Sequence, residues 1–367
     1  MQRLVPWLVA LGIAVLAARS GPAQQVRVAF VATEANNQHK LVADRGSVYV
    51  TYTQSISGVP QVHLAASPDG RRWHPVGQVS RGNGPSSLST LVVDRARHIH
   101  IAWTQFDGPV GRVYYRKYDG RWGEPQLLSP PGAYAGYPSM DIDSRDRLHL
   151  VWYGIREASA GTPTAHGAIY EIYYVRYDRR WTAPEQISPG IPDAINPALA
   201  IDPQDRVHVV WFQSDGRAFQ VVYTSRPASG AWTAPATLTR GEEPSTKPAL
   251  AVDRRGRVHA VWERNGGIDY VEGAAGTWST PLRLAENSSH PTVGLWSRGV
   301  FVLWSGKDGA VWVRAFDGTW RAAQRLGAGD YPNATPWRPN GDGTPYVVLT
   351  AAGQFQVTAL TQILQQR

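Results

Sequence analysis

An aromatic residue recurs along the chain at intervals of about fifty residues, each time at the end of a short β-branched and aromatic run. It stands at Tyr52, Trp103, Trp152, Trp211, Trp262 and Trp304, with Leu349 as a degenerate seventh copy. A repeat of this length is typical of β-propeller blades. Because one unit cannot cover both faces of its own sheet, each copy must pack against neighbours of the same kind.

The unit from Pro138 to Trp181 shows the pattern most clearly. It holds three strand-like runs separated by turn-forming residues, and Pro184–Ser188 supplies a fourth. We therefore predict an all-β chain folded as a β-propeller, with seven four-stranded blades and six as the alternative count. The last unit provides only three strands, so we expect Val26–Val31 to complete it and to close the ring by pairing the two chain ends.

The start of the chain and its composition define the domain organisation. Residues 1–23 combine Arg3, an apolar run and a small-residue exit, a pattern typical of a secretory signal peptide. Residues 24–367 are then one propeller domain, which we expect to be monomeric, secreted or periplasmic, and free of the membrane after cleavage. The chain has no cysteine, which excludes disulfides and cysteine-ligated metals.

The formal net charge of +8 raises the question of a nucleic-acid partner. The arginines, however, are spread over the turns of successive blades and do not form one basic cluster. An exported protein also seldom meets nucleic acid. We interpret the charge as a solvated surface and predict no nucleic-acid partner.

Histidines and aspartates also recur once per blade. The histidines stand three residues before the aromatic: His100, His149, His208 and His259. One position per blade spreads these side chains around a ring, whereas the ligands of a zinc ion converge at about 2 Å. The acidic residues Asp44, Asp94, Asp143, Asp202 and Asp253 follow the first strand and are suited to cap the turn's N–H groups. We predict structural roles for both series, and neither a metal ion nor another cofactor.

The variable loops of such a propeller gather on one face, at the mouth of the central channel, where a rigid scaffold holds binding residues. The residues placed immediately before each inner strand are Gln38, Leu88, Tyr137, Asn196, Lys247, His290 and Tyr331. Arg156 belongs to the longest insertion on the same rim, and Glu263 and Arg264 follow Trp262 there. Asp141 is unusual because its counterparts are apolar, and it either faces the channel or serves as a hydrogen-bonded structural acid.

Four turns carry a resemblance to a known family: Ser67–Trp73, Tyr118–Trp122, Tyr177–Trp181 and Phe316–Trp320. They resemble the Asp-box, or BNR, repeats of the sialidase-like propellers, in a divergent form and over nearly the whole mature chain. Catalytic members of that family use three arginines, a Tyr–Glu nucleophile pair and an acid/base Asp. Their early Arg-Ile-Pro segment has no counterpart here, and the resemblance transfers no catalytic residue to this sequence.

Three hypotheses about function follow from the sequence. The first is a binding module that takes a glycan or an envelope protein at the channel mouth, through Tyr137, Asn196, Lys247, His290 and Tyr331. The alternative is a sialidase-like exo-glycoside hydrolase acting at the same mouth, and the third is a purely structural module. We favour the non-enzymatic binding module.

Overall fold

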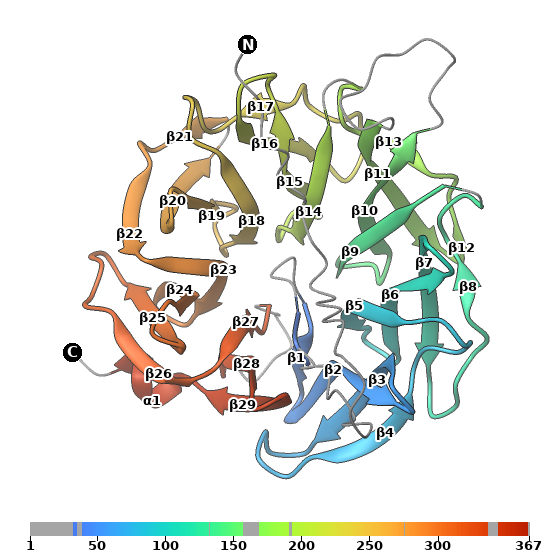
Figure 1. The fold of residues 1–367 in the computed structure, drawn as a ribbon. Coiled ribbons are helices and arrows are strands. Elements are labelled where there is room, and N and C mark those ends of the chain that lie inside the picture. Colours follow the sequence, from blue (N-terminus) through green and yellow to red (C-terminus); the bar gives the residue numbers. More distant parts are fainter. Residues whose placement is uncertain are drawn as a thin grey trace, which may run out of the picture.

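The computed structural model describes residues 32–34, 39–131, 133–156, 169–190, 193–274, 276–336 and 344–365. Seven antiparallel sheets stand around a central axis, each made from consecutive strands (Figure 1). The prediction of a seven-bladed all-β propeller is confirmed, and the alternative of six blades is wrong. In the described residues, no helix has the length and apolar character needed to cross a membrane.

The first four blades are regular. Blade 1 contains β1 (Leu41–Asp44), β2 (Ser47–Ile56), β3 (Val59–Ser67) and β4 (His74–Gln78). Blade 2 contains β5 (Ser86–Val93), β6 (Ile99–Asp107), β7 (Val110–Tyr118) and β8 (Gln126–Leu127). Blade 3 contains β9 (Ala135–Ile142), β10 (Leu148–Arg156), β11 (Ile169–Asp178), β12 (Arg180–Trp181) and β13 (Glu185–Gln186). Blade 4 contains β14 (Ala194–Ile201), β15 (Val207–Ser214), β16 (Phe219–Arg226) and β17 (Ala236–Thr237).

The remaining blades follow the same order. Blade 5 contains β18 (Ser245–Val252), β19 (Val258–Arg264), β20 (Gly267–Ala274), β21 (Thr277–Trp278) and β22 (Leu282–Glu286). Blade 6 contains β23 (Ser288–Trp296), β24 (Gly299–Gly306), β25 (Ala310–Phe316) and β26 (Gln324–Ala328). Blade 7 contains β27 (Asp330–Ala334), β28 (Tyr346–Ala351) and β29 (Gln354–Ala359), and the short helix α1 (Thr361–Gln365) follows it.

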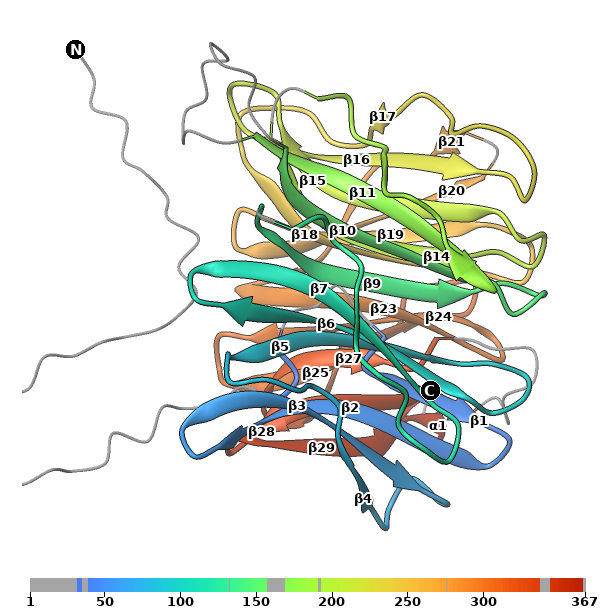
Figure 2. The same cartoon turned by 90° about the vertical axis from the view of Figure 1, so that its right-hand side faces the viewer.

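The strands run between two faces of the ring (Figure 2). The turn face carries the turns between the first and second strands of each blade. The mouth face carries the loops between the second and third strands and the connections from one blade to the next. The longest of these loops, which includes Glu157 and His166, lies outside the described residues.

The predicted closure of the ring is only partly within view. Val26–Val31 and the signal segment 1–23 lie outside the described residues. Directly after them, the Ala32 carbonyl accepts the Thr53 N–H of blade 1 at 3.0 Å. The Thr33 hydroxyl donates to the Tyr331 carbonyl at 2.9 Å, and the Thr33 N–H donates to Thr350 Oγ1, both in blade 7. Residues 32 and 33 thus connect the first and last blades, while closure by strand pairing stays a prediction.

The recurring tryptophans are buried between neighbouring blades. Trp103, Trp152, Trp211 and Trp262 have no exposed surface. Trp211 of blade 4 packs in a cluster with Val151, Ile172 and Tyr174 of blade 3, and the other three tryptophans contact the preceding blade in the same way. Burying one tryptophan is worth about 5 kcal/mol, at ~25 cal/mol per Å² over roughly 200 Å². This contact joins each sheet to the one before it.

Replacing Trp211 by alanine tests this packing. We expect Trp211→Ala to lower the free energy of unfolding by about 3–5 kcal/mol, because it leaves a cavity between blades 3 and 4. Urea unfolding measures the change. Leu282→Ala is the control, since Leu282 is 44% exposed and its loss should alter stability by less than about 0.5 kcal/mol. A Trp211→Ala effect below about 1 kcal/mol would contradict the assignment.

The recurring aspartates and histidines form one hydrogen-bond chain in each of blades 2 to 4, and in blade 5 the same residues lie in the same order with Asp253 3.7 Å from His259. In blade 3, Asp143 Oδ1 accepts the N–H groups of Arg145 and Arg147 at 2.9 Å. Its Oδ2 lies 3.1 Å from His149 Nε2, and His149 Nδ1 lies 2.7 Å from the Tyr174 hydroxyl. The same Asp, His and Tyr positions recur as Asp94–His100–Tyr115, Asp202–His208–Tyr223 and Asp253–His259–Tyr270.

These contacts support the structural interpretation of both series. The four aspartates of blades 2 to 5 cap their turns as predicted. Asp44 differs because its turn has only two residues, Arg45 and Gly46, and its carboxylate faces Arg97 of blade 2 at 3.8 Å. Each histidine is held between an acid and a tyrosine of its own blade.

The buried histidines predict a pH dependence of stability. Burial lowers the pKa of His149 and His208, and the hydrogen bonds to Asp143 and Asp202 only partly oppose it. The unfolded chain therefore binds protons first as the pH falls below about 6.5, and folding stability is lost. Phe301 fills the position of His149 in blade 6, so phenylalanine fits this place in the fold. His149→Phe should therefore flatten the dependence of the free energy of unfolding on pH between pH 6.5 and 5. Urea unfolding at each pH gives the slope, and His74→Phe at an exposed site should leave it unchanged.

Candidate functional site

The innermost strand of six blades carries a β-bulge opposite the recurring aromatic position. In β14, Ile195 pairs with Phe212 and Ala198 with Val210, so Asn196 and Pro197 together face Trp211. The first bulge residue has φ between 49° and 56° in all six blades: Leu88, Tyr137, Asn196, Lys247, His290 and Tyr331. Proline follows in five of them and suits the bulge because it brings no N–H that needs a ladder partner.

These bulges correct one detail of the sequence interpretation. The predicted mouth residues lie inside the inner strands, near their beginning, and not immediately before them. The left-handed backbone costs roughly 1–2 kcal/mol per residue, so the surrounding structure must hold it in place. Gln38, the expected member from blade 1, lies outside the described residues.

At three interfaces, the residue after the aromatic of one blade holds the bulge of the next. Thr104 Oγ1 accepts the Tyr137 N–H at 3.1 Å, and Ser305 Oγ accepts the Tyr331 N–H at 3.1 Å. Glu263 fills the same position between blades 5 and 6, where its Oε1 accepts the His290 N–H at 2.6 Å. A carboxylate therefore replaces the hydroxyl at one place in the ring.

Glu263 connects Lys247 and His290 into one network. Lys247 Nζ lies 3.1 Å from both carboxylate oxygens of Glu263 and 3.4 Å from His290 Nε2. The exposed fraction of the Lys247 side chain is 39%, against 17% for Glu263. The cation is thus held in place while part of it still faces solvent.

On the other side of His290 lies blade 7. His290 Nδ1 lies 3.2 Å from Asp330 Oδ1, and the Ser305 hydroxyl donates to the same oxygen. Burial alone would raise the pKa of Asp330, but these hydrogen bonds outweigh that effect and lower it. The imidazole of His290 and the ring of Tyr331 lie 4.1 Å apart at an angle of 30°. Blades 5, 6 and 7 therefore present one connected polar and aromatic surface at the mouth.

Tyrosines dominate the part of the mouth that blade 3 builds. The rings of Tyr137 and Tyr153 lie 5.3 Å apart, and the Tyr134 and Tyr153 hydroxyls lie 3.3 Å apart. Burial raises the pKa of Tyr137, and nearby Tyr134, Glu34 and Tyr331 raise it further. Tyr137 of blade 3 is thus influenced electrostatically by Tyr331 of blade 7 and by Glu34.

Glu34 and Lys40 add two opposite charges that interact electrostatically. Lys40 is 2% exposed, and its Nζ donates to the Ser89 carbonyl at 2.8 Å. Burial lowers the pKa of Lys40 to about 8, although the charge of Glu34 opposes this shift. Burial likewise raises the pKa of Glu34, against Lys40 and hydrogen bonds from Ser87 and Leu88. Neither residue was predicted from the sequence: Glu34 precedes the first blade, and Lys40 stands where blades 2 to 5 carry the small residues Thr90, Ser139, Ala198 and Ala249.

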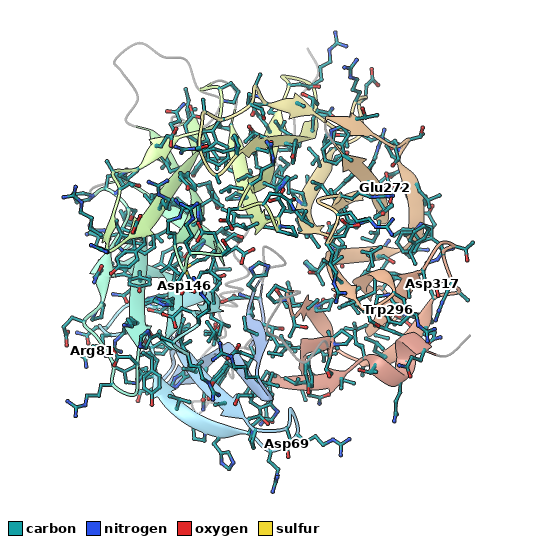
Figure 3. The ribbon with its side chains drawn as sticks, turned by 180° about the vertical axis from the view of Figure 1, so that it is seen from behind. Asp69, Arg81, Asp146, Glu272, Trp296 and Asp317 are labelled. Atoms are coloured by element: carbon teal, nitrogen blue, oxygen red, sulfur yellow. The ribbon has the colours of Figure 1, made fainter. Side chains whose placement is uncertain are left out.

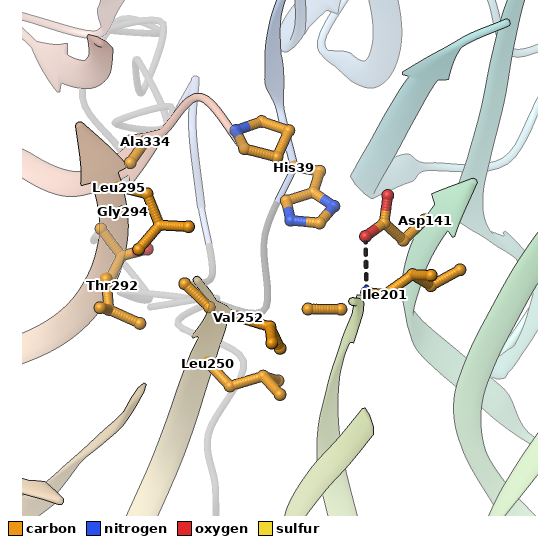
Figure 4. Close-up of a pocket in the computed structure, with 13 residues that line it drawn as sticks. His39, Asp141, Ile201, Leu250, Val252, Thr292, Gly294, Leu295 and Ala334 are labelled. Atoms are coloured by element: carbon orange, nitrogen blue, oxygen red, sulfur yellow. Dashed lines mark hydrogen bonds between the residues drawn. The ribbon is translucent and has the colours of Figure 1, made fainter. Parts of the chain in front are cut away.

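Asp141 lies deeper, in the wall of the channel. It is 5% exposed and lines a cavity of about 30 Å³ together with His39 (Figure 4). Its Oδ2 accepts the Ile201 N–H of blade 4 at 2.9 Å, and its Oδ1 accepts the Ile142 N–H. Asp141 is therefore a hydrogen-bonded acid that joins two blades, and it also lines this inner cavity.

Three predicted residues contribute differently. Asn196 is 8% exposed, and its Oδ1 has no hydrogen-bond partner among the described residues. Arg264 lies 3.5 Å from Glu243 and donates to the Arg240 carbonyl, outside the network around Glu263. Arg156 ends β10, and its side chain lies outside what the structure describes. Within the described part, no hydrogen bond joins the Tyr331 hydroxyl to a carboxylate.

Comparisons with known proteins were made for the whole chain. No protein-family model and no curated protein matches it. A solved protein of unknown function from Dyadobacter fermentans matches at 14% identity and a TM-score of 0.57, over 75% of this chain and 93% of that one. An ulvan lyase matches at 10% identity and a TM-score of 0.55, over 77% of this chain and 80% of that one. An α-L-arabinanase from Penicillium chrysogenum matches at 10% identity and a TM-score of 0.55, over 75% of this chain and 93% of that one. At these identities the likeness shows the fold alone, so it supports the propeller part of the sialidase resemblance.

Lys40 offers a direct test of the buried charge at the mouth. Its folded pKa of about 8 lies below the unfolded value near 10.4, so the unfolded chain binds more protons between these values. The wild-type free energy of unfolding should therefore rise from pH 8 toward pH 9.5, below the range in which unfolded tyrosines ionise. Lys40→Met should remove this rise, and the exposed-site control Lys117→Met should keep it. Equal slopes in wild type and Lys40→Met would show that Lys40 is not buried as a cation.

Proposed function

We propose that this protein binds a glycan at the mouth of its central channel. The observation that carries the proposal is the ring of bulge residues, which brings aromatic and polar side chains from different blades to one place. Tyr137, His290 and Tyr331 offer rings for the apolar face of a sugar, while Lys247 and Asn196 offer hydrogen-bonding groups for its hydroxyls. A rigid ring that presents few, fixed polar groups is what recognition of a polar ligand needs.

The similar structures and the sequence add to this proposal. The ulvan lyase and the arabinanase, which has arabinobiose bound, both act on polysaccharides. We also propose that the Asp-box relationship is real, since Asp69 Oδ1 accepts the N–H groups of Arg71 and Arg72 in the turn Ser67–Trp73. A signal peptide in residues 1–23 would bring a secreted or periplasmic, monomeric protein to extracellular glycans. An envelope protein is the alternative partner.

The proposal is tested by glycan-array screening of the full chain, followed by titration calorimetry with the best glycan. Tyr331→Ala and Tyr137→Ala should each weaken binding about tenfold, because each removes a stacking ring. Tyr118→Ala, a half-buried tyrosine at the turn face, is the matched control and should leave the affinity unchanged. Undiminished binding by both mouth variants would refute the site, and envelope-protein pull-downs would then be the next experiment.

A glycoside hydrolase or lyase at the same mouth is the second candidate. The observation that favours it is the hydrogen-bonded pair of His290 and Asp330 beside Tyr331, which could move a proton at a bound glycosidic bond. Asp330→Asn separates the candidates because it keeps the shape of the side chain and removes the acid of the pair. Binding should survive this change, whereas release of reducing sugar should fall at least about 100-fold if the His290–Asp330 pair transfers the proton.

A further inference from the structure

Neighbouring turns on the turn face contact each other from blade 1 to blade 5. Arg95 of blade 2 lies 3.0 Å from Asp146 of blade 3. The Ser144 hydroxyl of blade 3 donates to Asp205 of blade 4 at 2.7 Å. Gly256 of blade 5 lies so close to blade 4 that a Cβ atom there would come within 3.3 Å of Gln204 Oε1. Arg97, described above, joins blades 1 and 2, so these interfaces leave little room between turns.

The interface between blades 5 and 6 is open instead. Five residues, 253–257, separate β18 from β19, but only Ser297 and Arg298 separate β23 from β24. Next to this short turn lies a cleft of about 430 Å³, lined by residues of both blades. Figure 3 shows the ring from behind, with Glu272 of blade 5 and Trp296 and Asp317 of blade 6 at this interface. The cleft thus lies where the short turn of blade 6 meets the longer turn of blade 5.

The acids that line the cleft are already occupied. Asp253 accepts the N–H groups of Arg255 and Arg257 at 2.8 Å, and its Oδ2 lies 3.7 Å from His259 Nε2. Glu272 binds Arg257 at 2.8 Å and accepts the Tyr270 hydroxyl at 3.3 Å. Asp317 is paired with Arg321. Glu272 and Asp317 are thus each paired with an arginine, whereas the partners of Asp253 are two backbone N–H groups and a histidine.

Two arginines of the cleft have no such partner. Arg255 and Arg298 are exposed, come from the facing turns of blades 5 and 6, and form no ion pair among the described residues. The guanidinium of Arg298 lies 5.7 Å from the ring of Trp296, which fixes its position against an aromatic wall. The cleft thus combines hydrogen-bonded acids with the exposed guanidinium groups of Arg255 and Arg298.

We propose that this cleft is a second binding site, for the carboxylate or sulfate group of an acidic oligosaccharide. Guanidinium groups bind both anions through paired N–H donors in a fixed geometry. A volume of about 430 Å³ lies within the range of small-molecule sites and accommodates sugar rings beside the anion. The site lies on the face opposite the mouth and is independent of the function proposed for the mouth.

Titration calorimetry of the full chain with three hexasaccharides tests the site: oligogalacturonate, chondroitin sulfate and neutral maltohexaose. At constant ionic strength, the wild type should bind an acidic probe and not maltohexaose. The difference between oligogalacturonate and chondroitin sulfate shows whether carboxylate alone is enough or sulfate is preferred. Binding of neither acidic probe, or equal binding of maltohexaose, would overturn the proposal.

Matched variants locate the binding. Arg255→Ala/Arg298→Ala should weaken binding of the acidic probe at least tenfold, because it removes two charged donors. Arg121→Ala/Arg180→Ala removes the same charge from exposed turns of blades 2 and 3, and should change the affinity less than twofold. Equal losses in both pairs would mean attraction by net charge only and would overturn the site. Tyr331→Ala should leave this binding intact, which separates the cleft from the mouth.

Discussion

Burial of a tryptophan against the preceding blade is the interaction on which the whole ring depends. A single antiparallel sheet exposes two faces, and here each face is covered only by another blade. Trp103, Trp152, Trp211 and Trp262 are fully buried at these contacts. Because every sheet supports the next, the chain gains its stability from repetition and needs no disulfide.

The same contact also shapes the mouth. Each bulge lies opposite the recurring aromatic position, so the strand that carries a mouth residue is bent where the aromatic side chain anchors the sheet. The residue after the aromatic, which is Thr104, Glu263 or Ser305 at three interfaces, accepts a hydrogen bond from the N–H of the next blade's bulge residue. On the turn face, the Asp, His and Tyr chains fix the other end of the blades. Variation is thereby confined to side chains that project from a fixed backbone.

The periodic parts of this architecture could be predicted from the sequence, because repetition reveals them. The spacing of Trp152 and its copies indicated the blades, and the separate positions of His100 and His149 argued against a metal site. Glu34 could not be found this way, because it precedes the repeats, and Lys40 was overlooked although it stands where other blades carry small residues such as Thr90 and Ser139. Asp330 was missed because its contacts to His290 and Ser305 cross a blade boundary. The position of Glu263 offers a usable signal, since it is the acidic residue in a series that holds Thr, Ser, Tyr and Phe in the other blades.

The left-handed backbone at the bulges restricts which amino acids the mouth can use. Residues branched at Cβ tolerate this conformation poorly, and the six positions hold Leu, Tyr, Asn, Lys, His and Tyr, none of them β-branched. Unbranched polar and aromatic side chains can be exchanged there without a new backbone, since the bulge is specified by its neighbours. A combinatorial library of unbranched residues at the half-buried positions Tyr137, Lys247, His290 and Tyr331 would therefore vary the chemistry of the mouth while leaving the scaffold folded.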